Sequence, residues 1–204
     1  MNLYENYGKR DYCEIKLPAG EWSWCYSAAD LQNRLTERLP GQRVKAIYVG
    51  LYAYLQTQYS KTDLVDLSYT GGISLLVLET TALALRIRGE GMAEYRILPT
   101  DALSVREISD YLPEDLVQNE GYFFDLARHD RTCDYAGKRL ERVRVPRTTV
   151  WAMPVPGFDE KRAEKAGAAF DLPGEIYGTL EDGTCLRFIG DEYANYCILL
   201  ETGA

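Results

Sequence analysis

Hydrophobic residues recur every four positions in one early segment of the chain. Leu31, Leu35 and Leu39 form this stripe, which is the spacing of one face of an α-helix. Ser27 precedes the stripe and can cap a helix, while Pro40-Gly41 follows it and ends one. The pattern predicts a helix that begins after Ser27 and runs to about Leu39.

Most other apolar positions alternate with polar ones or form short continuous runs, as in β-strands. The predicted strands are Asp11–Leu17, Glu21–Tyr26, Arg43–Leu55, Gly72–Leu78, Ala82–Arg88, Ala93–Leu98, Arg139–Val150, Glu175–Leu180, Thr184–Ile189 and Ala194–Glu201. Between two of them, Glu181-Asp182-Gly183 indicates a hairpin with a type I′ turn. Two more helices are expected: one follows the capping-box pair Ser104 and Glu107, and one spans Asp159–Ala168.

The same order of elements occurs twice, and residues agree in three collinear blocks. Asp30-Leu31 matches Asp125-Leu126, and Gly41–Val49 matches Gly137–Val145. The third block aligns 85–98 with 186–199 and has seven identities in fourteen positions. One such block could arise by chance, but three in one order indicate an internal duplication.

The repeated hairpin permits a register prediction. Pairing Ile87 with Tyr95 separates an apolar face from a face that carries Arg86, Arg88, Glu94 and Arg96, which we expect to be solvated. The second copy predicts Leu186, Phe188 and Tyr196 on one face. Tyr95 and Tyr196 are therefore expected to face the core.

These patterns predict an α+β fold of two similar halves. Each half would be a mainly antiparallel meander of about four strands with one helix. The first half would span residues 1–100 with a repeat unit at 30–98, and the second would span 101–204 with a repeat unit at 125–199.

The net charge of the chain limits the classes of partner that we expect. The chain has 23 Lys and Arg against 31 Asp and Glu, a net charge of −8. Nucleic acid and anionic membrane surfaces are therefore not expected as partners, whereas a basic protein partner would be attracted. The five cysteines are odd in number and lack CxxC spacing, and no segment is a secretory signal or a bilayer span. A soluble, cytoplasmic protein is expected.

Motifs for catalysis are scarce. The single histidine, His129, rules out HExxH zinc sites, and no P-loop or Gly-x-Ser-x-Gly elbow occurs. On a helix, Asp125, His129 and Cys133 would share one face and could pair a thiol with an imidazole or bind a metal. A solvated charged turn explains the same residues, so no cofactor and no metal is expected.

Aromatic residues outside the shared repeat are the best pointer to function. Trp22, Trp24 and Tyr26 have no counterpart in the other half, and Tyr48, Tyr52 and Tyr54 form the aromatic face they could meet. They either cap the sheet or form a binding surface. We therefore predict a non-catalytic protein-interaction module, immunity- or inhibitor-like. The alternatives are a small-ligand binder with an aromatic cleft, or a hydrolase that uses carboxylates or His129 and Cys133.

Overall fold

The computed structural model describes residues 12–25, 27–50, 73–88, 92–107, 122–125, 135–150, 170–190 and 195–200. Within these ranges the strands pair antiparallel and one α-helix packs against them. This confirms the α+β class and the mainly antiparallel pairing. Of the described helices, none is both long and apolar enough to pass through a bilayer.

The larger sheet has eight strands in the order β2-β6-β5-β4-β3-β8-β1-β7. Its strands are β1 (Tyr12–Lys16), β2 (Ser23–Cys25), β3 (Val44–Gly50), β4 (Ser74–Leu78), β5 (Thr81–Arg88), β6 (Met92–Pro99), β7 (Ser104–Glu107) and β8 (Tyr122–Asp125). Strands β3 to β6 form a meander, a short 3-10 helix (Thr100–Ala102) leads from β6 to β7, and β2 and β7 are the two edges.

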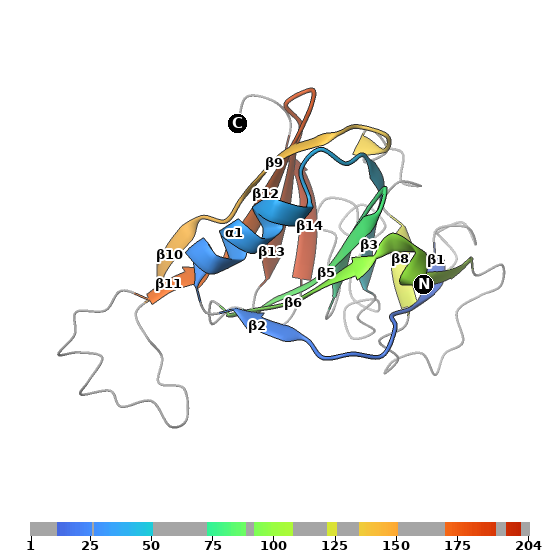
Figure 1. Ribbon diagram of the computed structural model, residues 1–204, viewed down its shortest axis with the longest axis horizontal. Coiled ribbons are helices and arrows are strands. Elements are labelled where there is room, and N and C mark those ends of the chain that lie inside the picture. The colour runs from blue at the N-terminus through green and yellow to red at the C-terminus, as the bar shows by residue number, and fades with distance from the viewer. Residues whose placement is uncertain are drawn as a thin grey trace, which may run out of the picture.

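The smaller sheet has four strands in the order β14-β13-β12-β9. Its strands are β9 (Leu140–Arg144), β12 (Glu175–Leu180), β13 (Cys185–Gly190) and β14 (Asn195–Leu200). β10 (Arg147–Val150) and β11 (Phe170–Pro173) form a separate pair. Figure 1 shows the helix α1 (Ala28–Arg38) beside β9 and in front of the smaller sheet.

Helix α1 forms as the four-residue stripe predicts. The Ser27 hydroxyl accepts a hydrogen bond from the Asp30 N–H at 3.2 Å, and Leu31, Leu35 and Leu39 are buried. Gln32, which follows Leu31 of the buried stripe, connects the helix to β9 through two hydrogen bonds. Its amide donates to the Val143 carbonyl at 2.6 Å and accepts from the Val145 N–H at 2.6 Å.

Two clusters of buried side chains form the core. The first core cluster joins α1, the β3–β6 meander and the smaller sheet, for example through Leu35, Leu85 and Leu186. The second core cluster lies on the other face of the meander and includes Cys13 of β1 and Phe123 of β8. Because both faces of β4 are covered, all five of its residues are buried, as its continuous apolar run predicts.

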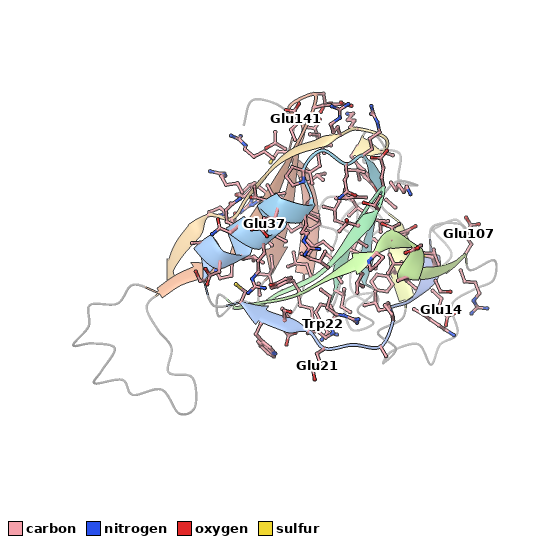
Figure 2. The ribbon with its side chains drawn as sticks, in the orientation of Figure 1. Glu14, Glu21, Trp22, Glu37, Glu107 and Glu141 are labelled. Atoms are coloured by element: carbon pink, nitrogen blue, oxygen red, sulfur yellow. The ribbon has the colours of Figure 1, made fainter. Side chains whose placement is uncertain are left out.

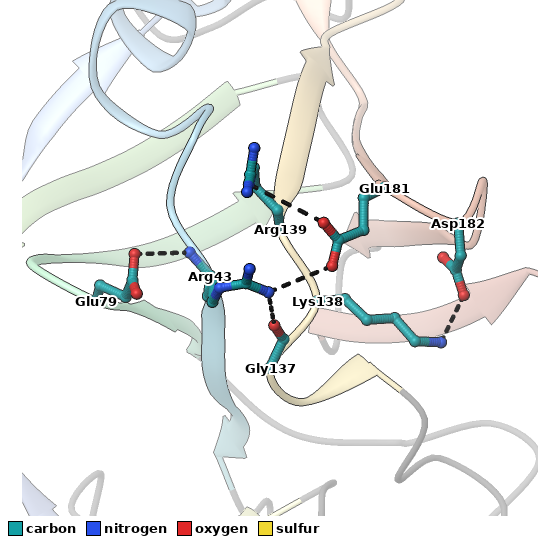
Figure 3. A network of polar contacts seen from close by, with 7 residues as sticks. All are labelled: Arg43, Glu79, Gly137, Lys138, Arg139, Glu181 and Asp182. Carbon is teal, nitrogen blue, oxygen red and sulfur yellow. Dashed lines mark hydrogen bonds and ion pairs between the residues drawn. The ribbon is translucent and has the colours of Figure 1, made fainter.

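The two sheets are joined at a bridge between Arg43 and Arg139, where the backbone bonds are reciprocal. The Gly41 N–H donates to Leu140 O at 2.7 Å, and the Gly137 N–H donates to Val44 O at 2.8 Å. Both glycines have positive φ, 89° and 81°, which side chains disfavour. Charged groups surround this junction (Figure 3); the Arg43 guanidinium donates to Gly137 O at 2.7 Å.

The register of the first hairpin differs from the prediction. Leu85 pairs with Tyr95 and Ile87 with Ala93, a shift of two residues. Because side chains alternate with a period of two, the faces are preserved, and Tyr95 is buried in the first core cluster as predicted. The other face is not the solvated surface that we predicted, since Glu94 is only 4% exposed.

The second hairpin does not follow the same register. Phe188 pairs with Cys197, and Tyr196 pairs with Ile189. The prediction that places Tyr196 on the face of Leu186 and Phe188 is therefore wrong. Its connection spans residues 191–194, whereas residues 89–91 connect the first hairpin, and this extra residue changes which positions oppose each other.

Other predictions fail because tertiary pairing overrides a local signal. Ser104 and Glu107 lie in strand β7, paired with β1, rather than at the start of a helix. Asp30 lies in α1 whereas Asp125 ends strand β8, so this matched pair occupies different kinds of element.

The predicted helix at 159–168 lies outside the described residues.

Candidate functional site

The two most exposed large hydrophobic side chains of the described residues lie on the two edge strands of the larger sheet. Trp24 of β2 is 49% exposed, and Val105 of β7 is 45% exposed. β2 is held by antiparallel pairing to β6, with Trp24 opposite Glu94, and the neighbouring Cys25 is buried in the first core cluster. Trp24 is thus presented on a backbone that the core anchors.

Trp22 lies just before β2 and has a different environment. It is partly buried against the second core cluster, and the Arg86 guanidinium lies 4.5 Å from the centroid of its ring. Arg86 also pairs with Glu94 at 3.6 Å. A cation held over an aromatic face is stabilising, so Trp22 supports the Arg86 side of this ion pair. Figure 2 shows Trp22 and the exposed Glu21 along this segment.

Not all of the predicted aromatic surface can be placed. Tyr48 of β3 packs against the second core cluster, as Trp22 does, so the structure brings both residues to one cluster. In that position they complete the packing of the sheet. Tyr26, Tyr52 and Tyr54 lie outside the described residues. Trp24 is therefore the exposed part of the predicted surface that the structure describes.

The chemical candidates also fall largely outside the described ranges. Asp125 is the last residue of β8, where it pairs with Tyr48 of β3, while His129 and Cys133 are not described. The helical geometry expected for the three residues does not extend to Asp125, which is in a strand. Among the described residues no group of three or more His, Cys, Asp or Glu side chains could hold a metal.

The sequence interpretation missed a polar cluster on the outer side of the smaller sheet. We call it the arginine face; it consists of Arg142, Arg144, Glu175, Tyr177 and Arg187. Arg144, Tyr177 and Arg187 stand side by side across three neighbouring strands, β9, β12 and β13. The guanidinium of Arg144 lies 4.8 Å from the centroid of the Tyr177 ring.

Hydrogen bonds fix the centre of the arginine face. Arg187 binds both carboxylate oxygens of Glu175, at 2.6 and 3.2 Å, and the Tyr177 hydroxyl donates to the same carboxylate. These bonds from Arg187 hold the pKa of Glu175 below its ordinary value. The pKa of Tyr177 is raised by burial and then by the bond to Glu175, so the phenol stays protonated near neutral pH.

Cys185 lies beside this cluster on β13, but it is a poor nucleophile. Burial raises the pKa of its thiol, and this effect outweighs the opposing influence of Arg144, Arg142 and Arg187. A thiolate is the reactive form of cysteine. The arrangement therefore favours binding over covalent chemistry.

One signal in the sequence could have revealed the arginine face. The exposed Arg142 and Arg144 lie on either side of the buried Val143, and Tyr177 lies between the buried Ile176 and Gly178. Both patterns are the alternation of a strand with one buried face. This alternation does not predict the order of the strands in the sheet, and that order brings β9, β12 and β13 together.

No family model, no curated protein and no solved structure matches this chain.

Proposed function

We propose that the protein is a non-catalytic protein-interaction module and that Trp24 on strand β2 is its anchor residue. The observation that carries the proposal is the exposure of Trp24, 49%, at an edge of the eight-stranded sheet. Tryptophan is among the residues that contribute most to binding energy at protein interfaces. In an immunity- or inhibitor-like protein, such a side chain would bind the partner, and the surface around it would cover the partner's functional site.

The support around Trp24 favours this role. Its neighbours on β2 are held in register with Tyr95 and Ala93 of β6, and the Cys25 thiol donates to Ser27 O at 3.1 Å. A side chain on an ordered strand loses less conformational entropy on binding than one on a loose loop. The net charge of −8 adds long-range attraction toward a basic partner.

Replacing the anchor tests this function. Wild-type protein, Trp24→Ala and the control Val105→Ala are used to capture proteins from the native cell lysate, and the retained partner is then purified. Titration calorimetry should give a dissociation constant about 30-fold weaker for Trp24→Ala, the effect of losing an anchor of about 2 kcal/mol. Val105→Ala, on the opposite edge strand, should bind like the wild type.

Two results would refute the function. One is that the wild-type chain retains no partner that binds it directly after purification. The other is that Trp24→Ala binds the purified partner as tightly as Val105→Ala does, because the exposed indole would then be no anchor.

We also propose that the two meanders derive from one duplicated unit. In support, β3–β6 and β9 with β12–β14 follow the same antiparallel order, and the bridge between Arg43 and Arg139 joins two residues that the alignment equates. The bond from Gly41 to Leu140 is likewise the counterpart of the bond from Gly137 to Val44. This proposal keeps the halves 1–100 and 101–204, although β7 and β8 pair within the larger sheet. The differing hairpin registers and the mismatch of Asp30 with Asp125 would then be later divergence.

A further inference from the structure

The arginine face lies on the side of the smaller sheet that points away from the core. On β12, Ile176, Gly178 and Leu180 are buried, whereas Glu175, Tyr177 and Thr179 alternate with them and are partly exposed. On β13, Leu186 and Phe188 are likewise buried in the first core cluster. The polar set is therefore accessible without any change in the packing of the core.

The positive charges on this face are not balanced by its carboxylates. Glu175 is occupied by Arg187 through two hydrogen bonds. Arg142 and Arg144 are exposed, and among the described residues neither forms an ion pair. The exposed Glu141 is the extra residue of a register shift on β9, because Arg142 pairs with Thr179 and Leu140 with Leu180. Among the described residues, these two guanidinium groups thus have no directly bonded carboxylate, and Arg144 acts on Glu175 only at longer range.

Geometry prepares these two arginines for an anionic group. They are two residues apart on one strand, so their side chains leave the backbone on the same side, separated by about 7 Å. Arg144 is held over the ring of Tyr177, whose hydroxyl is bound to Glu175. An arginine that is already positioned loses less entropy when it forms a bidentate bond to a carboxylate or phosphate.

We propose that the arginine face binds an acidic segment of a partner protein, with Arg142 and Arg144 contacting its carboxylates or phosphorylated side chains. This surface is built from strands other than β2, and the inference does not depend on Trp24. In Figure 2, Trp22 next to β2 and Glu141 of β9 lie on opposite sides of the molecule. A protein with two such surfaces could bridge a basic and an acidic partner.

Single-stranded nucleic acid fits this surface less well. Such ligands stack their bases on open aromatic rings, but Arg144 already covers the ring of Tyr177. The negative net charge would also repel a long phosphate backbone, whereas a short acidic peptide needs only local attraction.

Binding of labelled peptides to the full chain tests the proposal. Fluorescence anisotropy at low ionic strength would compare a glutamate-rich peptide, a phosphoserine peptide, a lysine-rich peptide and a single-stranded RNA. Arg142→Gln/Arg144→Gln should weaken binding of the best acidic peptide about tenfold or more. The control Arg34→Gln/Arg38→Gln removes two exposed arginines of α1, reaches the same net charge, and should bind like the wild type. Thermal unfolding of both variants verifies that they fold.

The peptides also distinguish the source of the negative charge. Tight binding of the phosphoserine peptide alone identifies a phosphorylated partner, and equal binding of both acidic peptides identifies a carboxylate-rich one; either result supports the proposal. Three results would overturn it: no binding of either acidic peptide, an equal loss in both double variants, or tighter binding of RNA than of the acidic peptides.

Discussion

Asp182 illustrates how one residue serves both the local turn and the tertiary structure. Its carboxylate accepts from the Thr184 N–H at 3.0 Å and from the Thr184 hydroxyl at 2.9 Å, which closes the turn between β12 and β13. Lys138, from the segment before β9, also binds it at 2.6 Å. The Asp-Gly pair predicts the turn, but nothing near it in the sequence predicts the lysine. The structure also places three residues, 181–183, in this connection, since the Leu180 N–H donates to Thr184 O.

The pKa of Asp182 provides a test at the residue scale. The bond from Lys138, followed by those from Thr184, lowers it from 3.8 to about 2. Because the folded pKa lies below the unfolded one, these bonds stabilise the fold above about pH 4, and this contribution is lost as the pH falls toward 2. Lys138→Met should raise the carboxyl midpoint in an NMR titration toward 3.8.

The bonds from Thr184 should keep that midpoint somewhat below its ordinary value. Lys45→Met removes an exposed lysine that donates to Glu79 O, and it should leave Asp182 unchanged. A midpoint that does not move in Lys138→Met would mean that Thr184 alone lowers the pKa.

At the scale of elements, α1 follows its local signals whereas β7 does not. Ser27 caps the helix and the leucine stripe is buried, so short-range spacing and packing agree there. Ser104 and Glu107 have helix-start spacing, yet they pair with Lys16 and Cys13 in the sheet. The capping box contributes about one hydrogen bond's free energy, which a ladder of backbone bonds to β1 outweighs.

Gln32 makes the contact between elements that is most easily tested. Its amide bonds Val143 and Val145 and so occupies the outer edge of β9, where another strand would otherwise pair. Gln32→Ala should lower the free energy of unfolding by about 1–3 kcal/mol and accelerate hydrogen exchange of the Val145 amide. Asn33→Ala, at the next and exposed position, is the control. Unchanged exchange at Val145 would show that the contact contributes nothing.

At the scale of the whole molecule, one core unites the two sheets. The first core cluster takes Leu186 from β13, Leu85 from β5 and Leu35 from α1. Since neither sheet covers this apolar surface alone, we expect the described parts of both sheets to unfold together.

Leu186→Ala tests this cooperativity. Loss of a fully buried leucine should cost about 2–5 kcal/mol, and exchange of the β4 amides in the other sheet should accelerate in proportion. Val105→Ala, at an exposed edge, should change stability by less than about 0.5 kcal/mol. If Leu186→Ala left the β4 amides protected, the two sheets would be separate folding units.

The amino-acid sequence by itself determined the features that depend on near neighbours. These are the helix after Ser27, the buried run of β4, the turn at Asp182-Gly183 and the division of the β5–β6 hairpin into two faces. Spacing of apolar and turn-forming residues sets each of them, because the relevant contacts lie within a few positions.

Only the tertiary structure decided what covers each face. Glu94 has the spacing of a solvated residue, but it is buried and pairs with Arg86, which packs on Trp22 from a separate segment. Arg144, Tyr177 and Arg187 are far apart in sequence and meet because β12 pairs with both β9 and β13. The periodicity of apolar residues predicts which side of a strand or helix a residue faces. The order and register of the strands arise from packing over the whole chain.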